Sequence, residues 1–575
     1  MLMASSRMRR SPPSPQTVVA IALALAAVVI VALVMSAGQP PEQLRARSFV
    51  YAWERGDYRA MHALTERQQR NGPLARFIAA YRTSAATATT SSLRAGKVGK
   101  ARDGVVSIPM TIRTRAFGEV RRTLRLPFSG GDDPRVKWTP NLVFPGLARG
   151  ERLTRDLALP RRADILARDG TPLAQGQERS SPLGAVASAI VGELGVPPPE
   201  RAERLVELGF PDDATVGLTG LERVFDERVA GKPGGELRAG SRVLARSTAL
   251  PANAVRTSID PAVQRAAVEA KGAYVGGVAV VRPRTGEILA LSGIAFSGLQ
   301  PPGSTFKIIT LTGVLEAEIA GPKSSYPVQT KTTIEGVDLE NANGESCGGT
   351  LRHSFAHSCN SVFAPLGAKL GGRRLVETAE AFGFNQDLGI PGAATSTIPP
   401  PDQIGDDLAV GSSAIGQGLV QATALQMASV AATIAARGRR PKLTLQRMER
   451  ASAARRPQVV DRDVARLVGR YMETVVDDGT GGAAAISGVR VAGKTGTAEL
   501  RTTQAPDCLP APDGPQCPPA LPDDPTDTDA WFAAFAPAGQ PRVAVGVLLV
   551  GAGVGGDTAA PVAKQVLVAA LEATR

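Results

Sequence analysis

Residues 301–315 read PPGSTFKIITLTGVL and predict a helix that begins close to Ser304. The body of this helix is apolar, and Lys307 follows Ser304 by three residues, so both side chains share one helical face. An apolar setting favours the neutral lysine amine, which can remove the proton of a neighbouring hydroxyl. The pattern therefore predicts a nucleophilic serine with a lysine base. Taken alone, it also fits a serine that caps a helix and a lysine that reaches water.

A second polar element, Ser358-Cys359-Asn360, follows a helical pattern over residues 351–357. Ser358 could relay a proton between Lys307 and a leaving group. The amide of Asn360 could hold a substrate peptide bond. By itself the element is a weak signal, because short Ser-x-Asn sequences are common.

The third element is Lys494-Thr495-Gly496-Thr497, which continues an alternating pattern at Val489 and Val491. The alternation places the element on a strand. A strand edge lined by Lys494 and Thr495 can bind a substrate carboxylate, and Gly496 lets a peptide backbone come close. Alone, the element would be read as a turn that binds a phosphate or a carboxylate.

The three elements together, in this order, resemble the Ser-x-x-Lys, Ser-x-Asn and Lys-Thr-Gly motifs of penicillin-interacting acyltransferases. Beyond the motifs, the chain resembles the class B penicillin-binding proteins over nearly all of its predicted exported length. Further segments carry this likeness: Arg168-Asp169-Gly170, Gly286-Glu287-Ile288-Leu289-Ala290, Ile415-Gly416-Gln417-Gly418, Asp478-Gly479-Thr480-Gly481 and Trp531-Phe532.

The resemblance implies one site built from all three motifs. Ser304 is then the acylated nucleophile, Lys307 its general base and Ser358 the proton relay. The backbone N–H groups of Ser304 and Thr497 form the oxyanion hole, which contributes about 3 kcal/mol per donor. The implied substrate-binding residues are Asn360, Lys494, Thr495, Gly496 and Thr497.

The amino-terminal sequence predicts a membrane anchor. Residues 18–35 are all apolar, and 18 helical residues span about 27 Å, close to a bilayer core. Arg7, Arg9 and Arg10 precede them, which favours a cytoplasmic amino terminus. We therefore expect a cytoplasmic tail at 1–17, a single-pass anchor at 18–36 and an extracytoplasmic remainder. A cleaved signal peptide is the alternative, although the residues after Met35 make a poor cleavage site.

The cysteine count fits an exported chain. Cys347, Cys359, Cys508 and Cys517 allow three disulfide connectivities, and we expect the two local pairs, Cys347 with Cys359 and Cys508 with Cys517. A zinc site that uses Cys347 and Cys359 is the alternative, because two histidines lie at i,i+4 spacing: His353 and His357. The spacing is irregular for zinc, so we expect no metal and no cofactor.

Length and pattern divide the 575 residues into several domains. Helical spacing near residues 46–53 and a hairpin near 106–128 predict a small α+β domain at 41–147, which resembles the NTF2-like extension of methicillin-resistance-type members. A pedestal or dimerisation domain is expected at 150–255. Residues 256–575 are expected to form the transpeptidase domain, a β-lactamase-like α/β fold with helices around an antiparallel sheet. The fold class is thus multidomain α+β behind one transmembrane helix.

The resemblance implies a peptidoglycan D,D-transpeptidase that cross-links stem peptides, is acylated by β-lactams and works beside a membrane-embedded glycan polymerase. The alternatives are a β-lactamase or D,D-carboxypeptidase, and a non-catalytic scaffold or β-lactam sensor. The net charge of +13 comes mostly from scattered arginines without a basic block, so nucleic acid is not an expected partner. One departure from the family pattern is Asp164, which stands where a glycine is usual and leaves the geometry of that hairpin in doubt.

Overall fold

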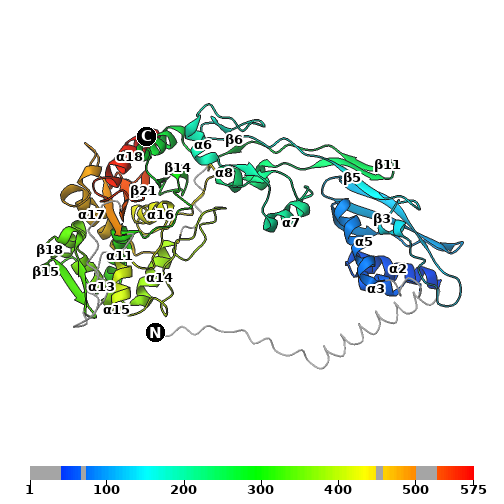
Figure 1. The fold of residues 1–575 in the computed structure, drawn as a ribbon, viewed down its shortest axis with the longest axis horizontal. Helices are drawn as coiled ribbons and strands as arrows, with labels where there is room; N and C mark the ends of the chain where they lie inside the picture. Colours follow the sequence, from blue (N-terminus) through cyan, green and yellow to red (C-terminus); the bar gives the residue numbers. More distant parts are fainter. Residues whose placement is uncertain (1–39, 67–72, 449–456, 500–526) are drawn as a thin grey trace, which may run out of the picture. The chain divides into compact units, whose positions relative to one another are not determined.

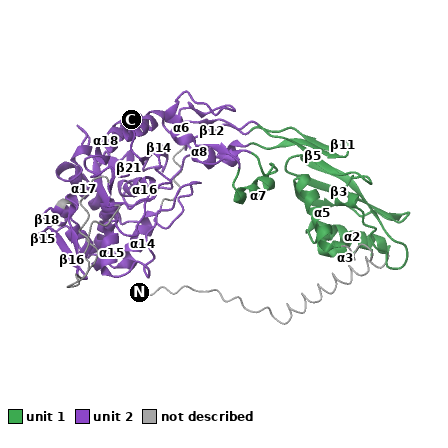
Figure 2. Cartoon of the chain, viewed as in Figure 1, with its two compact units in different colours: residues 1–160, 197–214, 231–251 green, residues 161–196, 215–230, 252–575 purple. Residues whose placement is uncertain are grey.

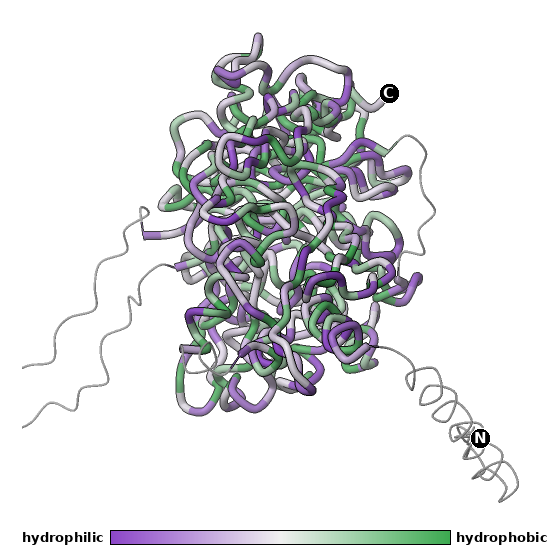
Figure 3. Tube along the Cα trace, turned by 90° about the vertical axis from the view of Figure 1, so that its right-hand side faces the viewer, coloured by the Kyte–Doolittle hydropathy of each residue, from purple (hydrophilic) through white to green (hydrophobic). Residues whose placement is uncertain are grey.

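The computed structural model describes residues 40–66, 73–448, 457–499 and 527–575. They form two compact units (Figure 2). Unit 1 holds the described residues up to 160 together with 197–214 and 231–251, and unit 2 holds 161–196, 215–230 and the described residues from 252 onward. The segment 150–255, predicted as one domain, is therefore divided between the two units. Hydrophobic and hydrophilic residues intermix along the folded chain (Figure 3).

Unit 1 packs three helices against a four-stranded antiparallel sheet. The helices are α2 (Pro41–Glu54), α3 (Tyr58–Ala63) and α5 (Leu74–Thr87), and the strands are β1 (Thr90–Ala95), β2 (Ala101–Arg102), β3 (Val105–Thr114) and β4 (Glu119–Pro127). Helical spacing puts Phe49 and Trp53 of α2 in the core, and alternation along β3 buries Ile108 and Met110. The predicted hairpin is confirmed as the β3–β4 pair.

The remainder of unit 1 includes three separate stretches of the predicted 150–255 segment. A three-stranded sheet in the order β11-β10-β5 adds Leu237 and Leu244 to the same hydrophobic core. The strands of this sheet are β5 (Leu153–Ala158), β10 (Gly234–Ala239) and β11 (Arg242–Ser247). Along the chain, η1 (Pro140–Val143) precedes β5, and α7 (Pro199–Leu208) lies between β5 and β10. The β5–β10 pairing joins residues 76 to 86 positions apart in sequence, which local patterns do not predict.

The first part of unit 2 consists of short elements. They are β6 (Ile165–Leu166), β7 (Pro172–Ala174), α6 (Ala185–Val191), β8 (Leu194–Gly195), β9 (Val216–Gly217), α8 (Gly220–Val224), α9 (Asp226–Val229) and β12 (Val255–Arg256). The β6–β7 hairpin forms despite Asp164, whose carboxylate accepts a hydrogen bond from the Gly176 N–H at 3.1 Å. A buried carboxylate, Glu222, pairs with Arg162 at 2.8 Å and Arg179 at 2.6 Å.

The main body of unit 2 is built on a five-stranded antiparallel sheet in the order β14-β13-β21-β20-β19 (Figure 1). The strands are β13 (Gly276–Val281), β14 (Ile288–Gly293), β19 (Ala492–Glu499), β20 (Thr528–Ala536) and β21 (Val543–Leu549). Helices cover both faces, so β13 and β21 are buried along their full length. On one face lies α16 (Ala424–Ala435), and on the other lie α10 (Pro261–Lys271) and α18 (Ala559–Ala573).

The remaining elements complete unit 2. They are η2 (Gly303–Phe306), α11 (Lys307–Glu316), β15 (Ser325–Gln329), β16 (Lys331–Ile334), β17 (Val337–Glu340), η3 (Ala342–Gly344), β18 (Cys347–Thr350), α12 (Leu351–Ala356), α13 (Asn360–Leu370), α14 (Gly372–Phe382), α15 (Asp407–Ala414), α17 (Arg462–Asp478) and η4 (Gly482–Ala484). Side chains cap several helices of unit 2: Thr350 caps α12, Thr423 caps α16 and Asp461 caps α17. The predicted antiparallel sheet with surrounding helices is confirmed.

Several predictions concern residues outside the described ranges. These are the tail at 1–17, the anchor at 18–36 and the pair Cys508 and Cys517. Within the described ranges, none of the helices combines the length and apolar character needed to cross a bilayer.

Candidate active site

Ser304 lies in the short helix η2, directly before α11. A left-handed Gly303, with φ of +50°, turns the chain into η2. The Gly303 N–H donates to the Gly416 carbonyl at 3.0 Å, and a Cβ on Gly303 would lie 2.5 Å from the Thr497 carbonyl oxygen. The backbone before the nucleophile therefore packs directly against the third motif, and a side chain at residue 303 would push them apart.

Lys307 is fully buried and links the first motif to the second. Its amine donates to the Ser358 carbonyl oxygen at 2.6 Å and to Asn360 Oδ1 at 2.6 Å, with Ser358 Oγ at 3.3 Å. A neutral amine has two hydrogens and one lone pair, so the two carbonyl-type oxygens can take both hydrogens. The lone pair is then free to accept the Ser358 hydroxyl hydrogen. This arrangement fits the predicted proton relay between Lys307 and Ser358.

Both lysines of the site are fully buried, and burial disfavours the charged form of each. Burial, and then the nearby Lys494, hold the pKa of Lys307 well below its usual range. Burial lowers the pKa of Lys494 to about 7. Aromatic rings face both amines, Phe363 at 5.8 Å from Lys307 Nζ and Phe355 at 5.6 Å from Lys494 Nζ. The site therefore favours a neutral Lys307 as base and leaves Lys494 close to its titration point at neutral pH.

The second motif has an unusual backbone. Ser358 adopts a left-handed conformation with φ of +61°, and Cys359 directly precedes helix α13. Cys347 and Cys359 form a disulfide with their Cα atoms 5.4 Å apart, as expected from the sequence. Both cysteines of the zinc alternative are thereby bonded to each other.

The third motif lies on the edge strand β19, next to η2. The Thr495 hydroxyl is 2.6 Å from that of Thr480, which precedes η4. At Gly496, a Cβ would lie 2.8 Å from the Pro302 carbonyl oxygen, so the first and third motifs touch through backbone. Thr497 Oγ1 accepts from the Gly555 N–H at 3.4 Å.

The structure thus brings the predicted site residues of all three motifs to one place between η2, α13 and β19. It adds three residues that were not predicted as part of the site: Gly416, Thr480 and Asn341. Gly416 and Thr480 do lie in segments that carry the family likeness, so that signal could have found them. Asn341 belongs to no quoted motif.

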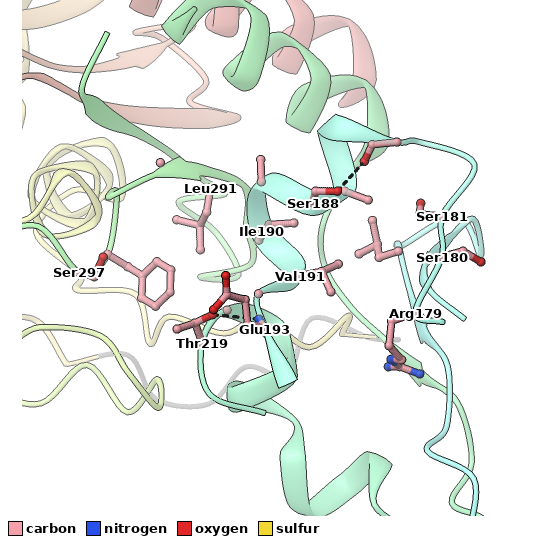
Figure 4. Close-up of a pocket in the computed structure, with 18 of the residues that line it drawn as sticks. Arg179, Ser180, Ser181, Ser188, Ile190, Val191, Glu193, Thr219, Leu291 and Ser297 are labelled. Atoms are coloured by element: carbon pink, nitrogen blue, oxygen red, sulfur yellow. Dashed lines mark hydrogen bonds between the residues drawn. The ribbon is translucent and has the colours of Figure 1, made fainter. Parts of the chain in front are cut away.

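A cavity of about 640 Å³ lies elsewhere in unit 2, between α6 and β14 (Figure 4). Ser188 and Ile190 of α6, Leu291 of β14 and Thr219 line it, and the Glu193 N–H donates to Thr219 Oγ1 at 3.0 Å. No residue of the three motifs is among its lining residues. The motifs, rather than this cavity, mark the site of chemistry, because they combine a nucleophile with a buried base.

Comparisons with known proteins agree with this arrangement. The sequence model of the penicillin binding protein transpeptidase domain matches residues 276–568. The penicillin-binding protein dimerisation domain matches 166–242, and the NTF2-like N-terminal transpeptidase domain matches 41–151. The chain belongs to the class B penicillin-binding proteins.

Relatives of this class B penicillin-binding protein include characterised enzymes. It is 33% identical over 385 residues to the peptidoglycan D,D-transpeptidase PbpA of Mycolicibacterium smegmatis, covering 55% of this chain and 72% of the relative. It is 28% identical over 399 residues to the peptidoglycan D,D-transpeptidase FtsI of Escherichia coli K12, covering 62% of this chain and 63% of the relative.

Solved structures show the same fold. Pseudomonas aeruginosa PBP2, solved in complex with WCK 5153, superposes with a TM-score of 0.60 at 25% identity, covering 73% of this chain and 96% of that one. PBPA from Mycobacterium tuberculosis superposes with a TM-score of 0.52 at 27% identity, covering 72% and 99%. The class B penicillin-binding protein described here therefore combines an NTF2-like domain, a dimerisation domain and a transpeptidase domain.

Proposed function

We propose that this chain cross-links peptidoglycan as a D,D-transpeptidase through an acyl-enzyme on Ser304. The observation that carries the proposal is the buried Lys307, whose amine contacts both Ser358 and Asn360 while its pKa is held well below the usual range. A neutral amine in this position is a base at neutral pH. The serine that it would serve lies one turn away, in η2 directly before α11.

In the first half-reaction the Ser304 oxygen attacks the carbonyl of the penultimate D-Ala of a stem peptide. The hydroxyl proton passes to Lys307, directly or through Ser358, and then to the nitrogen of the terminal D-Ala as that residue leaves. The negative charge that develops on the carbonyl oxygen would be held by the backbone N–H groups of Ser304 and Thr497. The product is an ester between Ser304 and the shortened stem peptide.

In the second half-reaction the amine of another stem peptide attacks this ester, and Ser304 recovers its proton as the cross-link forms. Lys494 and Thr495 would bind the terminal carboxylate of the donor peptide. The Asn360 amide would bind a peptide group of the donor. Gly496 leaves room for that peptide to run along β19, since any side chain there would already contact Pro302 and Trp531.

A β-lactam would follow the same first step. Its carboxylate would bind Lys494, and its strained amide would be attacked by Ser304, as for a D-Ala-D-Ala terminus. Its leaving nitrogen, however, stays bonded to the acyl group through the rest of the molecule. An incoming amine is therefore excluded, and a long-lived adduct on Ser304 results.

The proposal also covers placement in the cell. Residues 18–36 would anchor the chain in the membrane, residues 1–17 would stay in the cytoplasm, and the catalytic unit would lie outside it. Domain limits of 41–147, 150–255 and 256–575 are proposed for the NTF2-like, dimerisation and transpeptidase parts. A membrane-embedded glycan polymerase would supply the uncross-linked strands.

The test is a transfer assay with a thioester analogue of the stem peptide and a D-amino acid as acceptor. The proposal expects the acyl group to be transferred to the acceptor in preference to water, and expects no transfer by Ser304→Ala. Ser188→Ala, a change at an exposed position of α6, is the matched control and should behave like the wild type. Hydrolysis without transfer would instead identify a carboxypeptidase, and rapid penicillin turnover would identify a β-lactamase. Inertness toward both would favour a scaffold or sensor.

A further inference from the structure

The Ser358-Cys359-Asn360 motif is covalently bonded to a group of short strands, β15 to β18 with their connections (residues 325–350), which we call the wall. Cys347 begins β18, which pairs with β15 (Figure 1). Its disulfide partner Cys359 stands between Ser358 and Asn360, the two residues that bind Lys307. Both cysteines are buried, with exposed fractions of 4% and 0%. The covalent link thus enters the motif at its central residue rather than at a distant part of the loop.

Asn341 makes a second tie between the wall and the motif. Its side-chain oxygen accepts a hydrogen bond from the Ser361 N–H at 2.8 Å, in the first turn of α13. Its side-chain nitrogen donates to the Gln329 carbonyl at 2.8 Å and to the Glu345 carbonyl at 2.9 Å. The side chain is 5% exposed and joins three separate segments, as expected of a fixed support.

Asn360 itself is held from the same side. Its Nδ2 donates to the carbonyl of Glu340, the last residue of β17, at 2.8 Å. This bond orients the amide so that Oδ1 faces Lys307 Nζ at 2.6 Å. The wall residues therefore fix which atom of Asn360 is presented to the lysine.

The conformation of the motif needs such support. Ser358 is a non-glycine residue in the left-handed region, a strained conformation that persists only where the surroundings hold it. In this conformation the Ser358 carbonyl and Oγ both lie within hydrogen-bond distance of Lys307. A turn that relaxed to an ordinary backbone conformation would move these acceptors away from the lysine.

We propose that the Cys347–Cys359 disulfide and Asn341 are positioning residues for acylation, which hold the Ser358-Cys359-Asn360 turn against Lys307. The inference rests on the proposed function and names the part of the fold that keeps its base in place. Because both sulfurs are buried, the disulfide acts as a permanent clamp that resists mild reductants, and not as a redox switch.

The test compares acylation by a fluorescent penicillin between the full-length Cys508→Ser/Cys517→Ser protein, which cannot exchange disulfides, and the same protein with Cys347→Ser and Cys359→Ser added. We expect the second-order acylation rate to fall about 10- to 100-fold, as for a misplaced catalytic group. The loosened turn admits water to Lys307, so its pKa should rise. The acid limb of the rate–pH profile should then move to higher pH. Asn341→Ala should shift the profile in the same direction with the disulfide intact.

Leu567→Ala in α18 is the matched control, because it destabilises the same unit on the far face of the sheet from the motifs. When its melting temperature falls by as much as that of the clamp variant, Leu567→Ala should still show the acid limb of the rate–pH profile at the wild-type pH. A folded clamp variant with the wild-type rate and limb would overturn the proposal. Absence of any adduct on Ser304 in the parent protein would instead overturn the proposed function.

If the clamp variant does not fold, graded reduction of the parent protein gives the same answer. A dithiol reductant breaks the S–S bond, delivers two electrons and two protons to form the Cys347 and Cys359 thiols, and is itself oxidised to a disulfide. Alkylation and mass spectrometry measure the intact fraction. The acylation rate should follow that fraction and return on reoxidation. A fully reduced protein that acylates at the parent rate would refute the clamp.

Discussion

The amine of Lys307 donates to the side-chain oxygen of Asn360 at 2.6 Å, and this contact joins helix α11 to helix α13. One buried lysine thus binds the nucleophile's helix to the second motif. The arrangement makes the charge of Lys307 sensitive to what residue 360 presents, and it makes the geometry of both motifs depend on a single side chain.

Lys307→Met should abolish most acylation without unfolding the protein. Met is apolar, unbranched and similar in length, so it can fill the buried channel, and it removes the general base. We expect the second-order acylation rate to fall about 10²- to 10⁴-fold, with a melting temperature equal to or above that of the wild type. Stopped-flow mixing with a fluorescent penicillin measures the rate. A rate within a few-fold of the wild type would assign the base to another residue.

Asn360→Asp should change the pH at which the enzyme works. The new carboxylate would lie against Lys307 Nζ and favour the ammonium form, so the pKa of Lys307 should rise. The acylation rate at neutral pH should fall, and part of it should return as the pH is raised. Asn360→Ala removes the same hydrogen bond without adding charge and should be slow across the whole range. Identical profiles for the two variants would contradict this electrostatic reading.

The rate–pH profile of the wild type should be bell-shaped. Its acid limb reports deprotonation of Lys307, and its alkaline limb reports loss of charge from Lys494, whose pKa is about 7. Since substrate binding requires the charged form of Lys494, kcat/KM for a thioester substrate should decline as the pH rises above about 7. In Lys494→Arg the guanidinium stays charged, so the alkaline limb should disappear. Lys369→Arg, at an exposed position near the end of α13, should leave the profile unchanged.

Gly416→Ala should displace the nucleophile. Gly416 has φ of +79°, and a Cβ there would lie 2.0 Å from the Gly303 carbonyl oxygen. The backbone that carries Ser304 would therefore have to move, and acylation should fall by about 100-fold. The control is Gly321→Ala, where a Cβ would meet no atom within 4 Å. Equal rates for the two variants would show that the Gly416–Gly303 contact does not position the serine.

Glu222→Gln tests the buried ion cluster in the dimerisation segment. The Glu222 side chain is 1% exposed and pairs with both Arg162 and Arg179. Removing its charge therefore takes away the carboxylate that Arg179 contacts and leaves Arg162 with Asp226 at 2.9 Å. The free energy of unfolding should fall by about 3–5 kcal/mol. Glu207→Gln, which breaks an exposed pair with Arg204, should change it by less than about 1 kcal/mol. Urea titration measures both, and equal values would contradict the argument from burial.

The sequence predicts the candidate site well where its chemistry is local. Ser304 and Lys307 share one helical turn, and Lys494 to Thr497 share one strand, so spacing alone places them relative to each other. The strands of the central sheet could also be predicted from the sequence, because alternation and apolar runs mark β13, β14 and β21.

Nonlocal contacts account for what the sequence did not predict. Thr480 reaches Thr495 across 15 residues, and Asn341 reaches Ser361 across 20, without any periodic signal to connect them. The same limit explains the division of residues 150–255. Strand β5 pairs with β10 from far along the chain, so part of this segment folds with unit 1 and the rest with unit 2.

The most direct test of the account is to identify the residue that penicillin acylates. The full-length protein is incubated with a fluorescent penicillin, digested and analysed by mass spectrometry, beside Ser304→Ala. The account predicts one stable adduct on the peptide that contains Ser304, and none in the variant. An adduct on another residue, or a labelled Ser304→Ala protein, would contradict the assignment of Ser304 as the nucleophile.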